Sequence, residues 1–521
     1  MAINNICIIG GGTAGWLAAN HLGTALAKTA SENGQTPQIQ ITLIESPDIP
    51  TIGVGEGTVP TIRESLARFG IKESEFIRRC DATFKQSIKF INWMDSGARE
   101  VAHSFHHLFD APSPFGHDLS NYWLQNQMNA GAANSKEYAK FVAPQWHSCE
   151  RKLAPKTADM SDYKGAHAYA YHLNAAKFAE LLSENATSKF DVKHLKANVV
   201  EVELAQNGAI AAVHTENHGR LAFDFFVDCS GTASLLMEKA LAVPFVNKQD
   251  ELLVNKAIVV QVPTKPDDEI PPYTLATAHQ AGWIWDIALT NRRGVGLVYG
   301  DEFLSEVAAK DKLDRYLGNN THRERYRTID MRIGHLSKFW HKNCVALGLA
   351  QGFVEPLEAT SILLTDFAAS FLARKFPRTG DDLPTLEQRF NQVMTYAWKR
   401  VIDFIKLHYY LSDRVDSPFW LANKNEEHLS ETLKQRLQLW RSYTPHPDDF
   451  FAQFEVFTVD NYLYLLYGMN YPTTPLVTDK QNEQAHRAHA EKIQQANQYL
   501  KQKLPSHRQA LEELAFRSHT K

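Results

Sequence analysis

The sequence predicts an α/β fold with a Rossmann-type nucleotide-binding start and a mainly helical C-terminal subdomain. A short apolar run at 5–9 leads into the turn GGGTAG, after which apolar residues recur at helical spacing. Strand-like and helix-like segments then alternate through the middle of the chain. Beyond residue 380, long helical patterns rich in aromatic residues replace the strands. We therefore expect a nucleotide-binding body over 1–380 and the helical subdomain over 381–521.

The composition is that of an ordinary globular protein. The 521 residues are 44% hydrophobic and 22% charged, which is enough chain for more than one core. The 55 basic and 59 acidic residues leave a net charge of -4, which gives no footprint for nucleic acid or an anionic membrane surface. No apolar run reaches the roughly 18 residues of a membrane span, and the start MAINNICIIGGG lacks the features of a signal peptide. We expect neither nucleic acid nor membrane as a partner.

The cysteines indicate a reducing compartment. There are five, an odd number, and they show neither a CxxC pair nor cysteine and histidine at metal-ligand spacing. We therefore expect reduced, buried thiols, a cytoplasmic protein and no metal site. The cysteines are Cys7, Cys80, Cys149, Cys229 and Cys344.

Several segments beyond the first turn have a clear period. The strand-like ones are AIAAVHT, FDFFVDCSG, AIVVQV, GWIWDIAL and GVGLVYG, and the helix-like ones include AAKFAELLSENA, WKRVIDFIKLHYYL and DNYLYLLYGM. The polar stretch QNEQAHRAHAEKIQQANQYLKQKL is typical of a surface helix.

The turn after the first strand carries a dinucleotide fingerprint. Gly10, Gly12 and Gly15 give G-x-G-x-x-G between a strand and a helix, the context in which this pattern is informative. The first glycine allows the tight turn, the second lets a pyrophosphate approach the backbone, and the third lets helix and strand pack closely. Thr13 and Ala14 open the helix, whose N-terminus favours phosphate charge. We expect all five residues to contact the cofactor.

An acidic residue completes the fingerprint. The second strand, IQITLIES, ends at Glu45, where a carboxylate can accept hydrogen bonds from a ribose hydroxyl. Its distance from Gly15 is longer than usual, which we attribute to the polar loop SENGQTPQ before the strand.

These residues alone leave FAD and NAD open, but two later segments favour FAD. FDFFVDCSG at 223–231 and NCVALGLAQGFVEP at 343–356 each carry a β run into a glycine turn. In FAD enzymes of the hydroxylase type, such segments return to the first sheet and line the flavin. We therefore expect an FAD-binding fold with Gly348 among the cofactor contacts.

The stretch CDATFKQSIKFINW at 80–93 contains a lysine with two interpretations. Strand alternation puts Lys85 opposite the apolar face, together with Thr83, Ser87 and Lys89, and so predicts an ordinary solvated lysine. The alternative is a lysine that projects into a cavity, where its ammonium donates a hydrogen bond or its amine acts as a nucleophile.

Several motifs, in order, resemble those of the flavin-dependent tryptophan halogenases. They are TIGVGEGTVPTI at 51–62, DATFKQSIKFINW, AYHLNAAKFAELL at 170–182, GWIWDIAL at 282–289, GFVEPLEATSI at 352–362 and RVIDFIKLHYYLSDRVDSPFW at 400–420, all behind GGGTAGW. The resemblance covers most of the chain. It implies that FAD in its reduced form, dioxygen and a halide, bromide or chloride, together halogenate an electron-rich aromatic compound such as indole or tryptophan.

The resemblance assigns a role to Lys85 and to Glu358. In the family, a lysine matching Lys85 receives hypohalous acid and either hydrogen-bonds it or carries the halogen as a haloamine. Both routes need a nitrogen held in a dry, shaped site. Glu358, in PLEAT, matches a carboxylate near that lysine that orients the halogen donor or assists loss of the arene proton. The ordinary alternative is a glutamate stabilised by a helix dipole.

Two aromatic pairs also match the family. His107 and Phe109, in HHLFD, match the pair that flanks the indole ring, although such residues are also common in cores. Trp283 and Trp285 match tryptophans that shield the flavin side, although residues at i and i+2 of a strand simply fill one face.

The match has three departures. The family's S-T-G reads Ala359, Thr360 and Ser361 here, and the last two are the candidate halide site through their backbone amides. Loss of the glycine restricts that site if it needs a positive φ. The proline after W-x-W-x-I is replaced by Ala288. The family's clamp for the free amino acid does not align onto RSYTPHPDDFFAQFEVFTV, so another indole, an aromatic acid or a carrier- or peptide-linked aromatic stays open as substrate.

The sequence therefore predicts a two-component halogenase supplied by a separate flavin reductase, because no second nucleotide fingerprint is present. The family alone suggests a homodimer. Two alternatives stay open: an FAD-dependent aromatic monooxygenase, which transfers oxygen directly, and a flavin-binding homologue that has lost catalysis through the changes at Ala359 and Ser361.

Overall fold

The fold is that of a computed structural model, which describes residues 2–33, 39–49, 55–95, 102–130, 137–318, 323–476 and 480–517. Residues 34–38 of the polar loop and 51–54 of the TIGVGEGTVPTI motif lie outside the described residues.

The chain forms two compact units, each built from three separate segments. Unit 1 comprises Met1–Asp81, Leu173–Gln249 and Met331–Lys399, and unit 2 comprises Ala82–His172, Asp250–Asp330 and Arg400–Lys521. The predicted boundary at residue 380 falls inside the third segment of unit 1. The chain passes several times between the two units, so no single boundary can separate them. The local hydrophobic periodicity of the sequence does not show where the chain passes from one unit to the other.

Unit 1 contains the predicted nucleotide-binding sheet. Its six strands lie in the order β20-β21-β12-β1-β2-β8, and all neighbours are parallel except β20 and β21. The strands are β1 (Asn5–Ile9), β2 (Gln40–Glu45), β8 (Lys193–Lys196), β12 (Phe225–Asp228), β20 (Trp340–His341) and β21 (Cys344–Ala346). The segments FDFFVDCSG and NCVALGLAQGFVEP supply β12 and β21, so their predicted return to the first sheet is confirmed.

Helices and smaller sheets complete unit 1. The helices are α1 (Thr13–Asn33), α2 (Ile62–Phe69), α3 (Glu73–Arg79), α7 (Ala175–Phe190) and α9 (Thr360–Arg374). The remaining strands are β3 (Gly55–Gly57), β9 (Val199–Leu204), β10 (Ile210–Thr215), β11 (Gly219–Ala222), β13 (Phe245–Asn247), β19 (Gly334–Leu336) and β22 (Gly352–Phe353). Helix α1 packs against both α7 and α9. Apolar residues of β1, β12 and β21, with Leu236 and Met237, form a buried core cluster.

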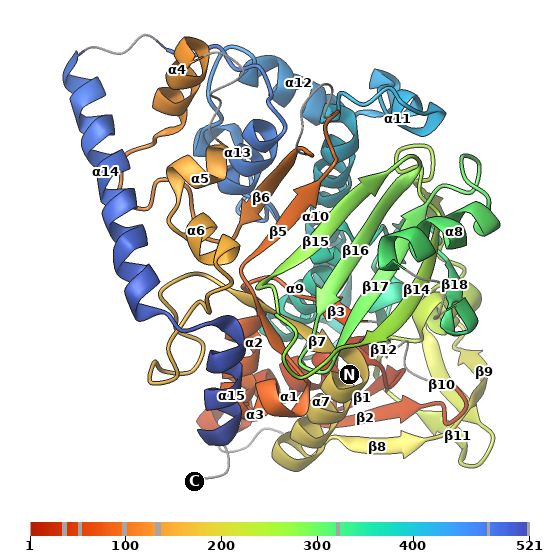
Figure 1. Cartoon of the computed structure of the whole chain (residues 1–521). Helices are drawn as coiled ribbons and strands as arrows, with labels where there is room; N and C mark the ends of the chain where they lie inside the picture. Colours follow the sequence, from red (N-terminus) through yellow and green to blue (C-terminus); the bar gives the residue numbers. More distant parts are fainter. Residues whose placement is uncertain are drawn as a thin grey trace. The chain divides into compact units, whose positions relative to one another are not determined.

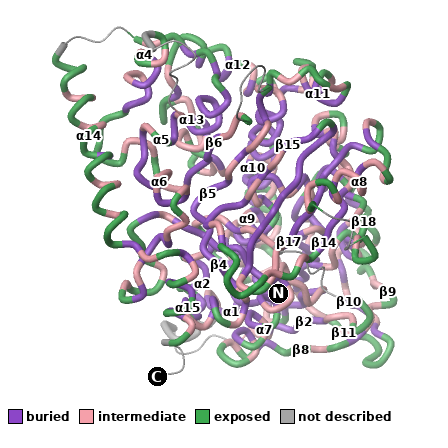
Figure 2. The backbone as a smooth tube through the Cα atoms, viewed as in Figure 1, coloured by how far each residue is buried: buried purple, intermediate pink, exposed green. Residues whose placement is uncertain are grey.

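Unit 2 is built on a seven-stranded sheet in the order β18-β14-β17-β16-β15-β5-β6. Its strands are β5 (Ser87–Ile91), β6 (Ser104–Leu108), β14 (Lys256–Pro263), β15 (Tyr273–His279), β16 (Gly282–Ala288), β17 (Arg292–Tyr299) and β18 (Arg327–Asp330). Only β15 and β5 pair in parallel, which joins the orange strands β5 and β6 to the green sheet in Figure 1. All seven residues of β16 are buried (Figure 2), as expected for a strand covered on both faces.

The helices of unit 2 are α4 (Ser120–Ala130), α5 (Tyr138–Val142), α6 (Gln145–Glu150), α8 (Glu306–Leu317), α11 (Pro418–Ala422), α12 (Glu431–Trp440), α13 (Val459–Gly468), α14 (Lys480–Lys503) and α15 (His507–Arg517). The division between the units falls within α10 (Leu383–Leu411). Among the described residues of 381–521, every regular element is a helix, as predicted. Helix α14, the predicted surface helix, lies along α5 and α6 with most of its described side chains exposed.

The prediction of reduced, buried thiols is also confirmed. All five cysteines are buried free thiols, and burial raises the pKa of the Cys80 thiol well above its usual value. Within the described ranges, no helix combines the length and apolarity needed to cross a bilayer.

Candidate active site

In unit 1, the turn between β1 and α1 requires glycine at two of the three fingerprint positions. Gly10 has a φ of 114°, and a Cβ there would overlap the carbonyl oxygen of Cys229. A Cβ at Gly15 would overlap the carbonyl oxygen of Gly10. Gly12 differs, because a Cβ there would meet no atom within 4 Å. The fold itself thus needs Gly10 and Gly15, whereas Gly12 borders open space, as the second glycine of a dinucleotide fingerprint does.

The start of α1 supplies donors beside that space. The helix begins at Thr13, so the amides of Thr13 and Ala14 have no acceptor within the helix. Gly348 lies directly against them: its φ is 64°, and a Cβ there would collide with that of Ala14. Unit 1 therefore brings together the predicted cofactor residues Thr13, Ala14 and Gly348.

Glu45 ends β2 at the carboxyl edge of the same sheet. Its Oε2 lies 2.7 Å from Nε2 of His194, whose ring is packed edge-on against Trp16 at 4.9 Å between centroids. A Cβ at Gly11 would overlap the Glu45 side chain, so this glycine allows the carboxylate its place. Sequence reasoning missed His194 and Gly11, although the unbroken GGG was a signal for the latter. The glycine turn, the helix start and Glu45 fit a dinucleotide such as FAD.

In unit 2, Lys85 is not on a solvated face. The predicted strand is divided at Gln86 into β4 (Thr83–Lys85) and β5. The backbone N–H of Gln86 donates to Pro272 O at 2.7 Å, and its carbonyl accepts from the N–H of Phe109 at 3.1 Å. Lys85 is 1% exposed, and Thr83 and Ser87 are fully buried. The prediction from alternation alone is therefore wrong, because segments remote in sequence cover the polar face.

The neighbours of Lys85 come from β7 (Ala170–Asn174) and from the end of β6. Strand β7 runs antiparallel to β4 and places Ala170 opposite Lys85. The Lys85 Nζ lies 5.4 Å from the centre of the Phe109 ring, within cation–π range. Lys85 and Phe109, both predicted site residues, thus lie together.

A histidine from the far end of the chain holds the strand that carries Lys85. Nε2 of His507 accepts the backbone N–H of Phe84 at 2.9 Å, and Nδ1 donates to the carbonyl of Ile270 at 2.8 Å. The ring is therefore neutral, and burial lowers the pKa of His507 to about 4. Sequence reasoning missed His507, since nothing in its local pattern connects it to β4.

His107 faces different neighbours from Phe109. It is 2% exposed, and its Nε2 accepts from Asn461 Nδ2 at 3.0 Å. Its ring lies 5.9 Å from that of Phe404 and 6.1 Å from that of Tyr464, both on helices. The structure thus sets the His107 imidazole among buried aromatic residues of α10 and α13.

The paired tryptophans of β16 are buried side by side. The rings of Trp283 and Trp285 are 6.2 Å apart, and the ring of Trp285 fills the space left by the missing side chain of Gly296. Tyr462, Tyr464 and Tyr467 on α13 are likewise buried.

In unit 1, Glu358 occupies an unusual backbone conformation just before α9. Glu358 and the following Ala359 have φ values of 64° and 54°, although neither is glycine. Each such residue costs roughly 1 to 3 kcal/mol, and strain of this kind gathers at functional sites. The Glu358 side chain is 3% exposed.

The candidate halide residues begin α9. Thr360 is 1% exposed, and its Oγ1 has no hydrogen-bond partner among the described residues. Ser361 stands where the family has a glycine, and its backbone is helical. This position therefore needs no positive φ. The amides of both residues, in the first turn, lack acceptors within the helix.

A buried polar cluster that sequence reasoning missed fixes α9 within unit 1. Asp366, on α9, accepts from Ser65 Oγ of α2 at 2.8 Å and lies 2.7 Å from Nε2 of His21 on α1. All three side chains are buried.

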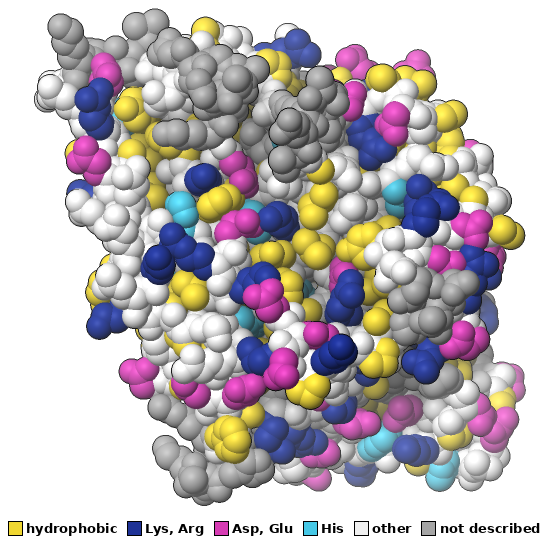
Figure 3. Space-filling view, viewed as in Figure 1, with side chains coloured by type: hydrophobic (Ala, Val, Ile, Leu, Met, Phe, Trp, Pro, Cys, Tyr) yellow, Lys and Arg dark blue, Asp and Glu magenta, His cyan; other side chains and the backbone are white. Residues whose placement is uncertain are grey.

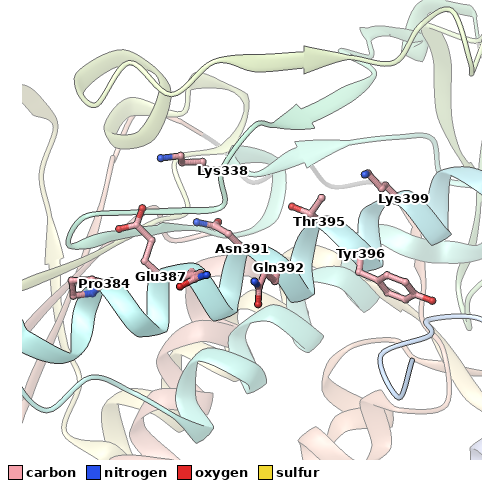
Figure 4. Close-up of a pocket in the computed structure, with 9 residues that line it drawn as sticks. Lys338, Pro384, Glu387, Asn391, Gln392, Thr395, Tyr396 and Lys399 are labelled. Atoms are coloured by element: carbon pink, nitrogen blue, oxygen red, sulfur yellow. The ribbon is translucent and has the colours of Figure 1, made fainter. Parts of the chain in front are cut away.

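A groove of about 770 Å³ follows α10 in unit 1 (Figure 4). Its lining includes Lys338, Glu387, Gln388, Asn391 and Lys399. It contains no predicted site residue. Its side chains are amides and groups of opposite charge that do not converge on one point, so we assign it no role. On the face drawn in Figure 3, basic and acidic side chains are interspersed. Within the described part of the chain, no cluster of histidine, cysteine and carboxylate side chains could hold a metal ion.

Comparisons with known proteins identify the family of the chain. Residues 5–483 match the family model described as tryptophan halogenase. The chain is 36% identical over 458 residues to tryptophan 6-halogenase ThaL of Streptomyces albogriseolus, covering 85% of this chain and 83% of the relative. It is also 36% identical over 454 residues to tryptophan 7-halogenase RebH of Lentzea aerocolonigenes, covering 84% and 82%.

Solved structures agree as well. A crystal structure of a tryptophan halogenase from Shewanella frigidimarina matches with a TM-score of 0.93 at 36% identity, covering 99% of this chain and 98% of that one. Tar14, a tryptophan C-6 flavin-dependent halogenase, matches with a TM-score of 0.88 at 33% identity, covering 98% and 99%. The chain therefore belongs to the family of flavin-dependent tryptophan halogenases.

Proposed function

We propose that the protein replaces a hydrogen of an indole or tryptophan-like substrate with bromine or chlorine. The observation that carries this proposal is the burial of Lys85, which is 1% exposed and faces an aromatic ring. Burial of a lysine ammonium is costly, so its place beside an aromatic ring favours a directed role for this nitrogen. The halogenase names of the relatives at about 35% identity support the same chemistry.

The cofactor is FAD, supplied in the reduced form by a separate flavin reductase. Gly10, Gly12 and Gly15 hold the pyrophosphate with the amides of Thr13 and Ala14. Glu45 binds the ribose, and Gly348 contributes from the second glycine turn. When bound, reduced flavin with dioxygen supplies the oxidising power that converts a halide ion to hypohalous acid.

The residues of the chain then have distinct roles. Lys85 receives the halogen and presents it to the substrate in a site that excludes water. Phe109 and His107 position the aromatic ring by stacking and by burial of area. Glu358 orients the halogen donor or accepts the proton that the arene loses, and the amides of Thr360 and Ser361 bind the halide. We place the protein in the cytoplasm because its thiols are free; a homodimer stays a prediction.

The test is a product assay with purified protein, FAD, an independent flavin reductase and NADH. Indole and tryptophan are offered with chloride or bromide, and products are identified by mass spectrometry. Lys85→Ala is expected to lower halogenated product by at least about 10³-fold while FAD binding is kept. Lys89→Ala is the matched control, since Lys89 lies in the adjoining strand and pairs with Glu150.

Three outcomes contradict the proposal. Hydroxylated product without halide indicates an aromatic monooxygenase. Flavin binding without turnover of any aromatic compound indicates a homologue that has lost catalysis. Equal activity of Lys85→Ala and Lys89→Ala removes Lys85 from the reaction.

A further inference from the structure

We propose that Gln145 is a positioning residue for the halogenation: its side chain bridges the two chain segments beside Lys85 and sets where the Phe109 ring lies. The inference rests on the proposed roles of Lys85 and Phe109. Gln145 is the first residue of α6 in unit 2 and is fully buried. It belongs to none of the motifs that carry the resemblance.

One arm of the bridge holds the backbone of Phe109. The Gln145 Oε1 accepts the N–H of Phe109 at 3.0 Å and the N–H of Asp110 at 2.7 Å. A carbonyl oxygen has two lone pairs, so these two N–H groups use its full capacity. Phe109 directly follows β6 and shares its N–H with the carbonyl of Gln86 at 3.1 Å. Because Gln86 is the residue after Lys85, this arm fixes Phe109 against the segment that carries the lysine.

The other arm holds the segment that leads into β7. The Gln145 Nε2 donates to the carbonyl of Ala168 at 2.7 Å. Ala168 lies two residues before Ala170, which is paired with Lys85. The contacts also determine how the amide is turned, because its oxygen faces two N–H donors and its nitrogen faces a carbonyl. One side chain therefore joins the end of β6 to the approach to β7, the two segments that flank Lys85.

Further hydrogen bonds keep Asp110 and Ala168 in place beside the bridge. The Asp110 carboxylate accepts the N–H of Ala168 at 2.6 Å and lies 2.7 Å from Nδ1 of His167. Nε2 of His167 lies 2.9 Å from the hydroxyl of Ser148, which is on the same helix as Gln145. These bonds form a closed loop that begins and ends on α6, so the bridge cannot shift without breaking several of them together.

The place of the Phe109 ring matters because its centre lies 5.4 Å from the Lys85 Nζ. Phe109 is only half-buried, which leaves part of the residue accessible to a substrate. An aromatic substrate that stacks on this ring presents one edge to the lysine, and the place of the ring decides which carbon is nearest. The geometry of Lys85 and Phe109 thus sets both the rate and the position of halogenation, and Gln145 sets that geometry.

The test compares two substitutions of buried amides in unit 2. Gln145→Met keeps the length and volume of the side chain and removes both arms of the bridge. Asn423→Leu is the matched control, because the buried Asn423 side chain accepts from Lys406 and donates to the carbonyl of Phe419. Gln145→Asn, which is one carbon too short to reach both segments, takes the place of the methionine variant if that variant folds poorly.

The first readout needs no catalysis. A fluorine label on the Phe109 ring, introduced as para-fluorophenylalanine, reports the surroundings and the mobility of the ring by fluorine NMR. We expect its resonance to shift and broaden in Gln145→Met and to stay unchanged in Asn423→Leu. In the unchanged chain, hydrogen exchange of the Phe109 and Asp110 amides should be slow, because both donate to a buried oxygen.

The second readout is the reductase-coupled product assay, with tryptophan and bromide. Gln145→Met is expected to lower kcat by on the order of 10²-fold, the loss that misplacement of reacting groups brings. The ratio of halogenated isomers should change by about tenfold, whereas Asn423→Leu should alter neither quantity. In a chain that already carries Phe109→Leu, Gln145→Met should leave the isomer ratio as it is, because Gln145 acts through the Phe109 ring.

Several results overturn the inference. An unchanged fluorine resonance in Gln145→Met shows that the bridge does not hold the Phe109 ring. A fall in kcat with an unchanged isomer ratio, or an equal fall in Asn423→Leu, reduces Gln145 to a structural residue. Rapid exchange of the Phe109 and Asp110 amides in the unchanged chain excludes the bridge without any variant. Failure of the proposed function appears separately, as absence of halogenated product from the unchanged chain.

Discussion

The glycine turn of unit 1 and the Lys85 strand of unit 2 differ in what determines their function. The turn is specified by its own residues: Gly10 needs a positive φ, and Gly15 must lie against the backbone of Gly10. The strand has an ordinary alternation, and its environment is made by β7, Phe109 and His507. A site formed by backbone groups can be inferred from a short stretch of sequence. A site formed by one side chain depends on the residues that the fold places around that side chain.

The largest expected effect separates two glycines of the turn. Gly15→Ala puts a Cβ into the carbonyl of Gly10, so we expect unit 1 to lose its thermal unfolding transition or to unfold far earlier. Gly12→Ala meets no protein atom, so the fold should survive while FAD affinity falls by on the order of 10²-fold or more. Calorimetry and flavin titration measure the two effects. If both variants lose stability equally, the open space beside Gly12 is not a cofactor site.

Glu358 tests whether a residue with a strained backbone in unit 1 matters as much as the lysine of unit 2. Glu358→Gln keeps the shape and removes the charge, and we expect turnover to fall by on the order of 10²- to 10³-fold with little change in stability. Glu387→Gln, on the α10 groove, is the matched surface control. Turnover in the Glu358 variant that equals the control reduces Glu358 to a structural glutamate.

The smallest effect concerns the remote support of β4. The pKa of His507 is lowered from 6.5 to about 4 in the folded state, so its contribution to stability is present above pH 6.5 and is lost as the pH falls towards 4. The contribution is about 3 kcal/mol in all, of which about 2 kcal/mol is lost between pH 7 and pH 5, and His507→Gln should remove this acid-dependent part. Urea unfolding at pH 7 and pH 5 measures it; an unchanged difference between the two pH values in the variant contradicts the assignment.

Most of the fold could be predicted from the sequence. The Rossmann-type start, the return of β12 and β21 to the first sheet, and the helical C-terminal part each follow from a local period or a glycine turn. The division into units could not be predicted, because it depends on contacts among segments such as 82–172 and 400–521.

The site was predictable where a motif carried it. Lys85 itself was found only through the resemblance, since its alternation predicts a solvated side chain. His507 and Asp366 were missed because their hydrogen-bond partners lie between 237 and 423 positions away along the chain, outside any window of sequence reasoning. In physical terms, secondary-structure propensity and hydrophobic periodicity act over a few residues. Desolvation of a side chain depends instead on segments that are remote in the sequence.

The threefold segmentation of each unit has a consequence for biosynthesis. A nascent chain that folds domain by domain as it emerges cannot complete unit 1 until Lys399 has left the ribosome, or unit 2 until α15 has followed. The flavin-side unit is thus assembled first, while β4 still lacks the hydrogen bond from Phe84 to His507. During this interval the emerging protein has a complete unit 1, while the strand that carries Lys85 still lacks its support from α15.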